Sequence, residues 1–368
     1  MPDNPLLALV RLGQSPWYDF ITRELLASGR LARIIAADGL RGMTSNPTIF
    51  QKAVAGSSDY DDDIRRLAAD GRSPAEIFEA LSVSDVRAAC DVFRPLYDAT
   101  GAADGLVSLE VTPDLAHDSS GTIAAATRLW QAVDRPNAMI KIPGTREGLP
   151  AITEALAQGI NINITLLFSV ERYREVIAAF MEGLGRRVRQ GLPVDRMASV
   201  ASFFVSRVDG RVDPLLEKAG DPQRLRGTIA IANAGAAYEV FERSLETPAW
   251  KALAAKGARP QRPLWASTSA KDPRYRDTYY VEALIAPRTV NTMPPETFDA
   301  YRDHGEPEVR IRQAMAEAPG RIAALEASGI SLAEVTRFLE EDGVAKFADS
   351  YRQLLAGIEA KLGALAAR

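Results

Sequence analysis

The sequence predicts an α/β protein folded as a (β/α)8 TIM barrel, with additional helices and a helical C-terminal extension. Short apolar runs alternate with stretches of helical apolar spacing, which is the pattern of βα units around a parallel sheet. The apolar runs number eight, and 368 residues suit a single barrel domain. A doubly wound open sheet would give a similar alternation and stays open as the alternative fold. The sequence has no repeat, low-complexity tract or Pro/Gly/Ser linker, so we expect one domain over residues 1–368.

Each predicted strand is one of the short apolar runs, and each predicted helix fills a gap between two of them. In chain order, the strands are expected at Gln14–Asp19, Gly39–Ser45, Gly105–Val111, Ala138–Ile142, Ile160–Phe168, Met197–Val205, Pro263–Ser267 and Arg288–Met293. Helical spacing follows the first, third, fourth and fifth of these strands, at Phe20–Ala36, Thr122–Ala132, Glu147–Ala157 and Val170–Gln190.

Two further segments exceed what a single crossover needs. The segment Phe50–Thr100 lies between the second and third strands and is expected to add helices outside the barrel. The tail Glu308–Arg368 is charged and has apolar residues at helical spacing. This tail could cover the barrel mouth or form a subunit contact in a homo-oligomer, and its periodicity fits both. Helix starts are marked by capping boxes at Ser73 with Glu76 and at Ser331 with Glu334.

Composition excludes several classes of protein. Charged residues make up 25% of the chain and hydrophobic ones 46%, which suits a soluble globular enzyme. The net charge is −4 and no basic patch stands out, so we expect no nucleic-acid partner. The single cysteine, Cys90, fits a reducing compartment. Only two histidines occur, His117 and His304, and no His/Cys cluster has the spacing of a metal site. The N-terminus shows neither a signal peptide nor a membrane span, so we expect a cytoplasmic protein.

Lys141 is the most informative residue, because it lies within the apolar segment AMIKIPGT. A buried ammonium is destabilised, so a buried lysine tends to lose its proton and become a nucleophilic amine. Such an amine can form a Schiff base with a ketone and then act as an electron sink. The alternative is that Lys141 ends an edge strand and points to water, which is the commoner fate of a lone lysine.

The neighbouring strands favour a site over that alternative. Side chains alternate between the two faces of a strand, so Lys141 shares its face with Met139, and Glu110 shares its face with Ser108. By the same rule, two later strands turn further polar side chains inward, near their C-terminal ends: Asn161, Asn163, Thr165 and Ser202. Barrel active sites lie at that end. Four strands with buried polar groups are hard to explain as packing, since each unpaired group costs about 1–3 kcal/mol.

These segments resemble the transaldolase family over most of the chain. GMTSNPTIF (Gly42–Phe50) is similar to the family's first signature, and MIKIPGTREGL (Met139–Leu149) is similar to the second, which contains the Schiff-base lysine. The segments SLEVTP, NITLLFS, WASTSAKDP and TVNTMP add to the resemblance. It implies a (β/α)8 barrel with no metal and no organic cofactor.

The resemblance implies four catalytic residues. Lys141 corresponds to the residue that forms the covalent Schiff base. Asp19 corresponds to the acid/base that takes the proton from the C4 hydroxyl as the C3–C4 bond breaks. Glu110 corresponds to the carboxylate that works through a water, and Thr165 to the hydroxyl that holds this water. The two carboxylates favour an ammonium whereas catalysis needs the free amine, and we expect burial to outweigh the carboxylates.

The resemblance also implies a substrate-binding set. Asn46 and Asn163 correspond to amides that hydrogen-bond the bound dihydroxyacetone unit, and Ser202 lies beside it. Arg207 corresponds to a phosphate ligand, and Lys271 is expected to supply a second phosphate charge.

Three of these residues also have a plain structural interpretation. Asp19 could be a helix N-cap before FITRELL. Arg207 could form a surface ion pair, since SRVDGR also contains Asp209 and Arg211. Asn46 precedes Pro47, and Asn-Pro is a common turn.

The resemblance implies a transaldolase of the non-oxidative pentose phosphate pathway, with sugar phosphates as substrates. It would move a dihydroxyacetone unit from sedoheptulose 7-phosphate to glyceraldehyde 3-phosphate, giving erythrose 4-phosphate and fructose 6-phosphate. Phe204 supports transfer, because the related fructose-6-phosphate aldolases, which release free dihydroxyacetone, have Tyr there. That aldolase activity is one alternative. A catalytically silent barrel that only binds sugar phosphates is the other.

Overall fold

The eight predicted strands form a closed parallel barrel in the computed structural model, which describes residues 4–221 and 223–366. Within these residues, the barrel strands are β1 (Gln14–Asp19), β2 (Gly42–Thr44), β3 (Leu106–Glu110), β4 (Ala138–Pro143), β5 (Ile162–Leu167), β6 (Ser199–Phe204), β7 (Arg262–Ala266) and β8 (Thr289–Met293). They pair in chain order, and β8 pairs with β1 to close the barrel. The predicted (β/α)8 barrel is therefore confirmed, and the open-sheet alternative is wrong.

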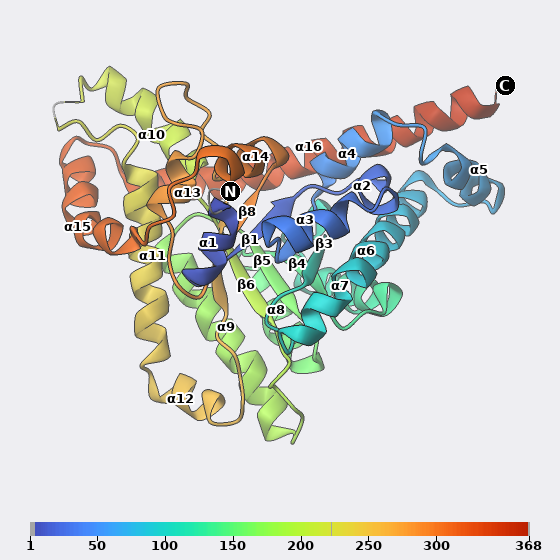
Figure 1. Ribbon diagram of the computed structural model, residues 1–368, viewed down its shortest axis with the longest axis horizontal. Coiled ribbons are helices and arrows are strands. Elements are labelled where there is room, and N and C mark those ends of the chain that lie inside the picture. The colour runs from blue at the N-terminus through green and yellow to red at the C-terminus, as the bar shows by residue number, and fades with distance from the viewer. Residues whose placement is uncertain (1–3, 222, 367–368) are drawn as a thin grey trace.

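Helices surround the barrel and separate its strands (Figure 1). Those before β3 are α1 (Pro5–Arg11), α2 (Arg23–Ala27), α3 (Arg30–Asp38), α4 (Pro47–Ala55), α5 (Asp61–Ala69) and α6 (Pro74–Ala99). Between β3 and β7 lie the 3-10 turn η1 (Pro113–Leu115), α7 (Ser119–Val133), α8 (Gly148–Gln158), α9 (Val170–Arg189), α10 (Ser206–Lys218), α11 (Ile229–Leu245) and α12 (Pro248–Ala254). The last are α13 (Tyr279–Ala283), α14 (Pro295–His304), α15 (Ile311–Ala327) and α16 (Leu332–Ala366).

One predicted helix is broken in two. The sequence predicts a continuous helix over Phe20–Ala36, whereas the structure has α2 and α3 with Gly29 between them. Gly29 has a φ of +72°, a conformation that glycine adopts without the clash of a Cβ. Helical spacing alone did not reveal this break, because apolar residues on both pieces face the same core.

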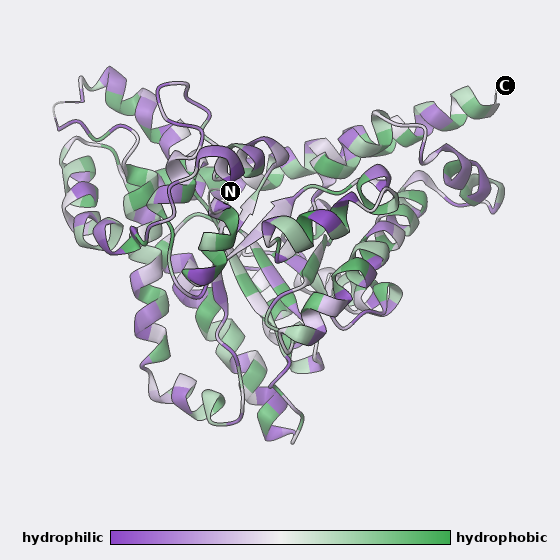
Figure 2. Cartoon of the chain, viewed as in Figure 1, coloured by the Kyte–Doolittle hydropathy of each residue, from purple (hydrophilic) through white to green (hydrophobic). Residues whose placement is uncertain are grey.

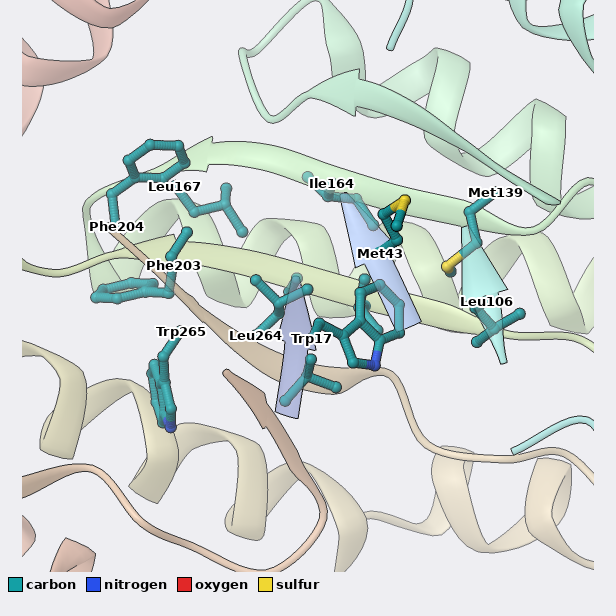
Figure 3. Packing of buried hydrophobic residues seen from close by; sticks show 14 of the residues in the cluster. Trp17, Met43, Leu106, Met139, Ile164, Leu167, Phe203, Phe204, Leu264 and Trp265 are labelled. Carbon is teal, nitrogen blue, oxygen red and sulfur yellow. The ribbon is translucent and has the colours of Figure 1, made fainter. Parts of the chain in front are cut away.

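A layer of large apolar side chains fills the barrel interior. Trp17, Leu106, Met139 and Leu264 are all buried, and each precedes the last residues of its strand (Figure 3). Gly42 pairs with Trp17 in register, and a Cβ at Gly42 would lie 2.4 Å from the indole. Glycine is therefore required at this position. Above this packed layer, the strand ends are free to carry polar groups.

Polar and charged side chains fill the N-terminal end of the barrel. The Arg262 guanidinium donates to the Ser15 hydroxyl at 2.9 Å and to the Asp104 carboxylate at 3.1 Å. Ser15 also donates to Asp104 at 2.8 Å. These three groups join β1, β7 and the chain before β3 at the N-terminal end of the barrel.

The segments outside the simple βα pattern are helical and contact the barrel. The capping box at Ser73 and Glu76 is confirmed at the start of α6. At the tail, the Ser331 hydroxyl accepts from the Glu334 backbone N–H at 3.4 Å. The helix α16 crosses above the barrel and contacts α4, α10 and β5 (Figure 1). We infer one domain, since the tail packs on the same core as the strands.

The hydropathy of the residues along the outer helices agrees with their packing around the barrel. Figure 2 shows mixed hydrophilic and hydrophobic residues along the outer helices, as expected for helices with one face on a core. In residues 4–221 and 223–366, no helix combines the length and apolar character that crossing a bilayer requires.

Candidate active site

A cavity of about 1100 Å³ lies at the C-terminal ends of the barrel strands, beneath α4 and α16. Most of the predicted site residues line it: Asp19, Asn46, Lys141, Thr165, Ser202, Phe204, Arg207 and Lys271. Glu110 and Asn163 do not line it, but each hydrogen-bonds a residue that does. Lys141, Thr165, Ser202 and Phe204, which were placed inward by alternation of faces, thus lie in one cavity with Asp19, Asn46, Arg207 and Lys271, which were assigned by the family resemblance.

Lys141 is buried and paired with Glu110. These residues are register partners on β4 and β3. The Lys141 Nζ donates to the Glu110 carboxylate at 3.0 Å and to the Ser45 carbonyl oxygen at 3.4 Å. The exposed fractions of the two side chains are 6% and 4%. The edge-strand alternative for Lys141 is therefore wrong.

Burial favours the protonated form of the Glu110 carboxyl. It raises the pKa of Glu110, while the Lys141 charge opposes that rise. A carboxyl with a raised pKa is a suitable proton donor, and this one lies 3.0 Å from the Lys141 Nζ.

Asp19 faces the cavity from the end of β1. Its carboxylate accepts from the Thr44 hydroxyl at 2.6 Å, and Thr44 is 2.7 Å from the Thr292 hydroxyl. Burial raises the pKa of Asp19, opposed by the charges of Lys141 and Arg207. The N-cap of α2 is Thr22, whose hydroxyl accepts from the Leu25 N–H, so the helix-cap interpretation of Asp19 is wrong.

Thr165 is placed by an irregularity in β5. The pairing of β5 with β6 shifts register between Ile164 and Leu167, and Leu166 has a φ of +60°. A bulge of this kind re-aims side chains next to functional sites. Within the described chain, the buried Thr165 hydroxyl has no hydrogen-bond partner, although it lines the cavity. A ligand or water in the cavity could satisfy it.

The amide side chains differ in what they offer a ligand. Asn163 is fully buried: its NH2 donates to the Ser108 hydroxyl at 3.0 Å, and its carbonyl accepts from the Ser202 hydroxyl at 2.7 Å. Asn163 therefore orients Ser202, which does line the cavity. Asn46 caps α4 by accepting from the Ile49 N–H at 3.0 Å, so only its NH2 group is left for a ligand.

Two cations face the outer part of the cavity. Arg207 lies in the first turn of α10, with its guanidinium 5.1 Å from the Phe204 ring centroid. Its Nη1 is buried and has no partner within the described residues. Lys271 is exposed in the loop after β7 and lines the same cavity. A helix N-terminus with an unpaired guanidinium suits an anion such as phosphate, and the surface ion pair considered for Arg207 is absent from the described residues.

Buried carboxylates fix these cations relative to each other. Asp209 and Asp213 follow Arg207 on α10 and accept from the Tyr280 hydroxyl at 3.0 Å and the Tyr275 hydroxyl at 2.7 Å, respectively. Both tyrosines lie in the chain after Lys271. The loop that carries Lys271 is therefore tied to the helix that carries Arg207.

Replacing Asp209 with Asn should change how stability depends on pH. Burial and the Asp213 charge raise the pKa of Asp209 to about 7 from 3.8. Between these values the folded protein binds a proton that the unfolded chain releases, so the free energy of unfolding decreases as pH rises. This contribution is fully present below about pH 4 and lost above about pH 7, and is at most about 4 kcal/mol.

Urea unfolding from pH 4 to pH 8 would test this, with the exposed Asp195→Asn as control. The parent and D195N should lose stability across this range more steeply than D209N. Equal slopes in the parent and D209N would contradict the expectation.

Sequence reasoning missed several residues of the site. Thr44 and Thr292 lie in the quoted segments GMTSNPTIF and TVNTMP, and their hydroxyls at strand ends were a usable signal. Phe347 of α16 lines the cavity and places its ring centroid 5.7 Å from the Lys141 Nζ. No sequence pattern marks that contact, because 206 residues separate the two positions. Among the residues that the structure describes, no group of three or more His, Cys, Asp or Glu side chains is placed to hold a metal ion.

The chain is similar in sequence to known proteins. The sequence model of the Transaldolase/Fructose-6-phosphate aldolase family matches residues 16–358. A transaldolase of Frankia alni is 53% identical over 363 residues, covering 98% of each chain. A transaldolase of Acidothermus cellulolyticus is 52% identical, covering 98% of this chain and 97% of its own. A transaldolase of Thiobacillus denitrificans is 47% identical over 350 residues, covering 95% of this chain and 98% of its own.

Proposed function

The chain belongs to the transaldolase/fructose-6-phosphate aldolase family, and from this premise we propose how its barrel performs the reaction. It is an enzyme with transaldolase function. In our proposal it transfers a dihydroxyacetone unit from sedoheptulose 7-phosphate to glyceraldehyde 3-phosphate, giving erythrose 4-phosphate and fructose 6-phosphate. This reaction belongs to the non-oxidative pentose phosphate pathway, and we place the enzyme in the cytoplasm.

The observation that carries the mechanism is the buried Lys141 amine, 3.0 Å from the Glu110 carboxylate at the cavity floor. The Nζ attacks the ketone carbonyl of the donor, and the adduct loses water to give an iminium ion. Glu110 supplies a proton to the departing hydroxyl and later recovers it, acting through a water that the Thr165 hydroxyl holds. The unpaired Thr165 hydroxyl supports this role.

Carbon–carbon cleavage then requires a base and an electron sink. Asp19 takes the proton from the C4 hydroxyl, the C3–C4 bond breaks, and its electron pair moves into the enamine on Lys141. The aldehyde product leaves, and a second aldehyde adds to the enamine in the reverse sense. The Thr44 hydrogen bond supports Asp19 as the base, because it holds the carboxylate toward the cavity. Asn46 and Ser202 hold the dihydroxyacetone unit, and Asn163 acts through Ser202.

The Arg207→Ala variant should lose affinity for phosphorylated donors. A charge-assisted hydrogen bond contributes about 1.5–3 kcal/mol, so kcat/KM for fructose 6-phosphate should decrease by about 10–100-fold. The value for unphosphorylated fructose should change little, since fructose never makes that contact. Steady-state kinetics with both donors would measure the difference.

Arg211→Ala is the matched control, because Arg211 lies one turn further along α10 with its guanidinium 4.2 Å from the Phe338 ring. We expect R211A to lower kcat/KM by less than about threefold. An equal loss for fructose and fructose 6-phosphate in R207A would contradict phosphate binding by Arg207.

The two alternatives to transfer would treat the sugar phosphate differently. A fructose-6-phosphate aldolase would release free dihydroxyacetone, and a silent barrel would bind sugar phosphates without reacting. Phe204 supports transfer, because a ring without a hydroxyl at this position cannot orient a water against the fragment. The intact catalytic set supports catalysis, because Lys141 and Asp19 line one cavity and Glu110 lies 3.0 Å from the Lys141 Nζ.

Borohydride trapping distinguishes all three functions. The protein is incubated with fructose 6-phosphate and sodium borohydride, and its tryptic peptides are weighed by mass spectrometry. We expect a dihydroxyacetone-sized adduct on Lys141 and little free dihydroxyacetone without an aldehyde acceptor. Rapid release of dihydroxyacetone would identify an aldolase. Folded protein with no adduct on any lysine would identify a silent barrel.

A further inference from the structure

The helix α16 forms the roof of the cavity. It runs across the C-terminal end of the barrel, between α10 and α4 (Figure 1). Five of its side chains line the cavity: Phe338, Leu339, Asp342, Lys346 and Phe347. Of the two uses that the sequence left open for the tail, the structure thus shows the first, a cover over the barrel mouth.

Phe347 is the roof residue that the structure places over the reactive nitrogen. Its ring centroid lies 5.7 Å from the Lys141 Nζ, and only 6% of the residue is exposed. Its neighbour on the chain, Lys346, is held by an ion pair to Asp342 at 2.6 Å. The apolar ring therefore separates Lys141 from solvent on the side away from the barrel floor.

Close packing keeps the ring in this position. Gly343 lies one turn before Phe347, and a Cβ there would come within 3.0 Å of the Leu166 side chain, which follows Thr165 on β5. One turn after Phe347, the Ser350 hydroxyl accepts from the Thr48 hydroxyl of α4 at 2.8 Å. The helix is thus attached to β5 on one side of the ring and to α4 on the other.

We infer that Phe347 determines whether the bound dihydroxyacetone unit is transferred or released, an inference that rests on the proposed Schiff-base function. Release begins when the enamine carbon that was C3 takes a proton, which converts the enamine into an iminium ion. Water then adds to the iminium carbon, the C–N bond breaks, and dihydroxyacetone and the free Lys141 amine result.

The ring acts on the first of these steps. The water used for hydrolysis belongs to the floor of the site, near Glu110 and Thr165, and every turnover needs it. Bulk solvent on the roof side is different, since it can only protonate the enamine before the acceptor arrives. Excluding that solvent prolongs the life of the enamine without slowing hydrolysis of the final product.

The test compares release with transfer in the full-length protein. Free dihydroxyacetone formed from fructose 6-phosphate alone is divided by the rate of transfer to erythrose 4-phosphate. In Phe347→Ala this ratio should rise roughly tenfold, and in D2O each released dihydroxyacetone should contain one carbon-bound deuterium. In Phe347→Leu, which keeps an apolar side chain and the helix, the ratio should rise by about threefold. An unchanged ratio in both folded variants would overturn the inference.

Phe338→Ala is the matched control, because Phe338 lies on the same helix and lines the same cavity but is 42% exposed and contacts Arg211. Its ratio of release to transfer should equal that of the parent. A rise in F338A as large as that in F347A would mean that loosening α16 causes release, which would also overturn the role of the ring. Failure of the underlying function would look different, since the parent itself would then show no borohydride adduct on Lys141.

Discussion

Replacing Lys141 with Ala is expected to abolish borohydride trapping and to reduce kcat by at least about 10⁴-fold. No other amine that the structure describes lies on the cavity floor beside Glu110, so no group can replace the covalent step. Folding should survive the change. Burial already raises the pKa of Glu110, so that carboxyl can take up a proton when its partner is removed.

The measurement is the coupled transfer assay together with mass spectrometry of the trapped protein, and circular dichroism confirms that the variant folds. Lys256→Ala serves as control, because Lys256 is exposed in the turn after α12, outside the cavity lining. K256A should trap and turn over as the parent does. An adduct of undiminished yield on any other lysine of K141A would contradict the assignment of Lys141 as the nucleophile.

The second large effect is expected for Asp19→Asn, which should lower kcat by about 10²–10⁴-fold while leaving Schiff-base formation intact. An amide oxygen can still accept from the Thr44 hydroxyl, so the geometry of the β1 end should persist. Cleavage stops because the amide cannot take the C4 proton. Borohydride should then trap the whole six-carbon sugar phosphate on Lys141 instead of the three-carbon unit.

The pH profile gives a second readout for Asp19. The base works only when ionised, and burial raises the pKa of this carboxyl above its usual range. Activity of the parent should therefore decrease as pH falls through that raised pKa, and the residual activity of D19N should lack this acidic limb. Asp59→Asn is the control, because Asp59 is an exposed carboxylate at the outer part of the same cavity. A three-carbon adduct of normal yield in D19N would contradict the role of Asp19.

The sequence by itself determined the eight strands and most of the side chains that share the inward face of each strand, whereas the pairing of β8 with β1 decided that the sheet closes into a barrel. Each strand has an apolar face that must pack under helices, so the strands are recognisable in the sequence as short apolar runs. Alternation of side chains then assigns every second residue of a run to the interior. Lys141, Glu110 and Ser202 were predicted in this way and lie where the alternation put them.

Other features depended on contacts between residues far apart in the chain, and only the tertiary structure decided them. The hydrogen bonds from Thr292 through Thr44 to Asp19 join β8, β2 and β1, which become neighbours only when the barrel closes. The helical spacing of the tail predicted a helix but not its direction, because an apolar stripe can pack on any apolar surface. The position of Phe347 over Lys141 follows from how α16 packs on β5 and α4, and no local pattern in the sequence encodes that packing.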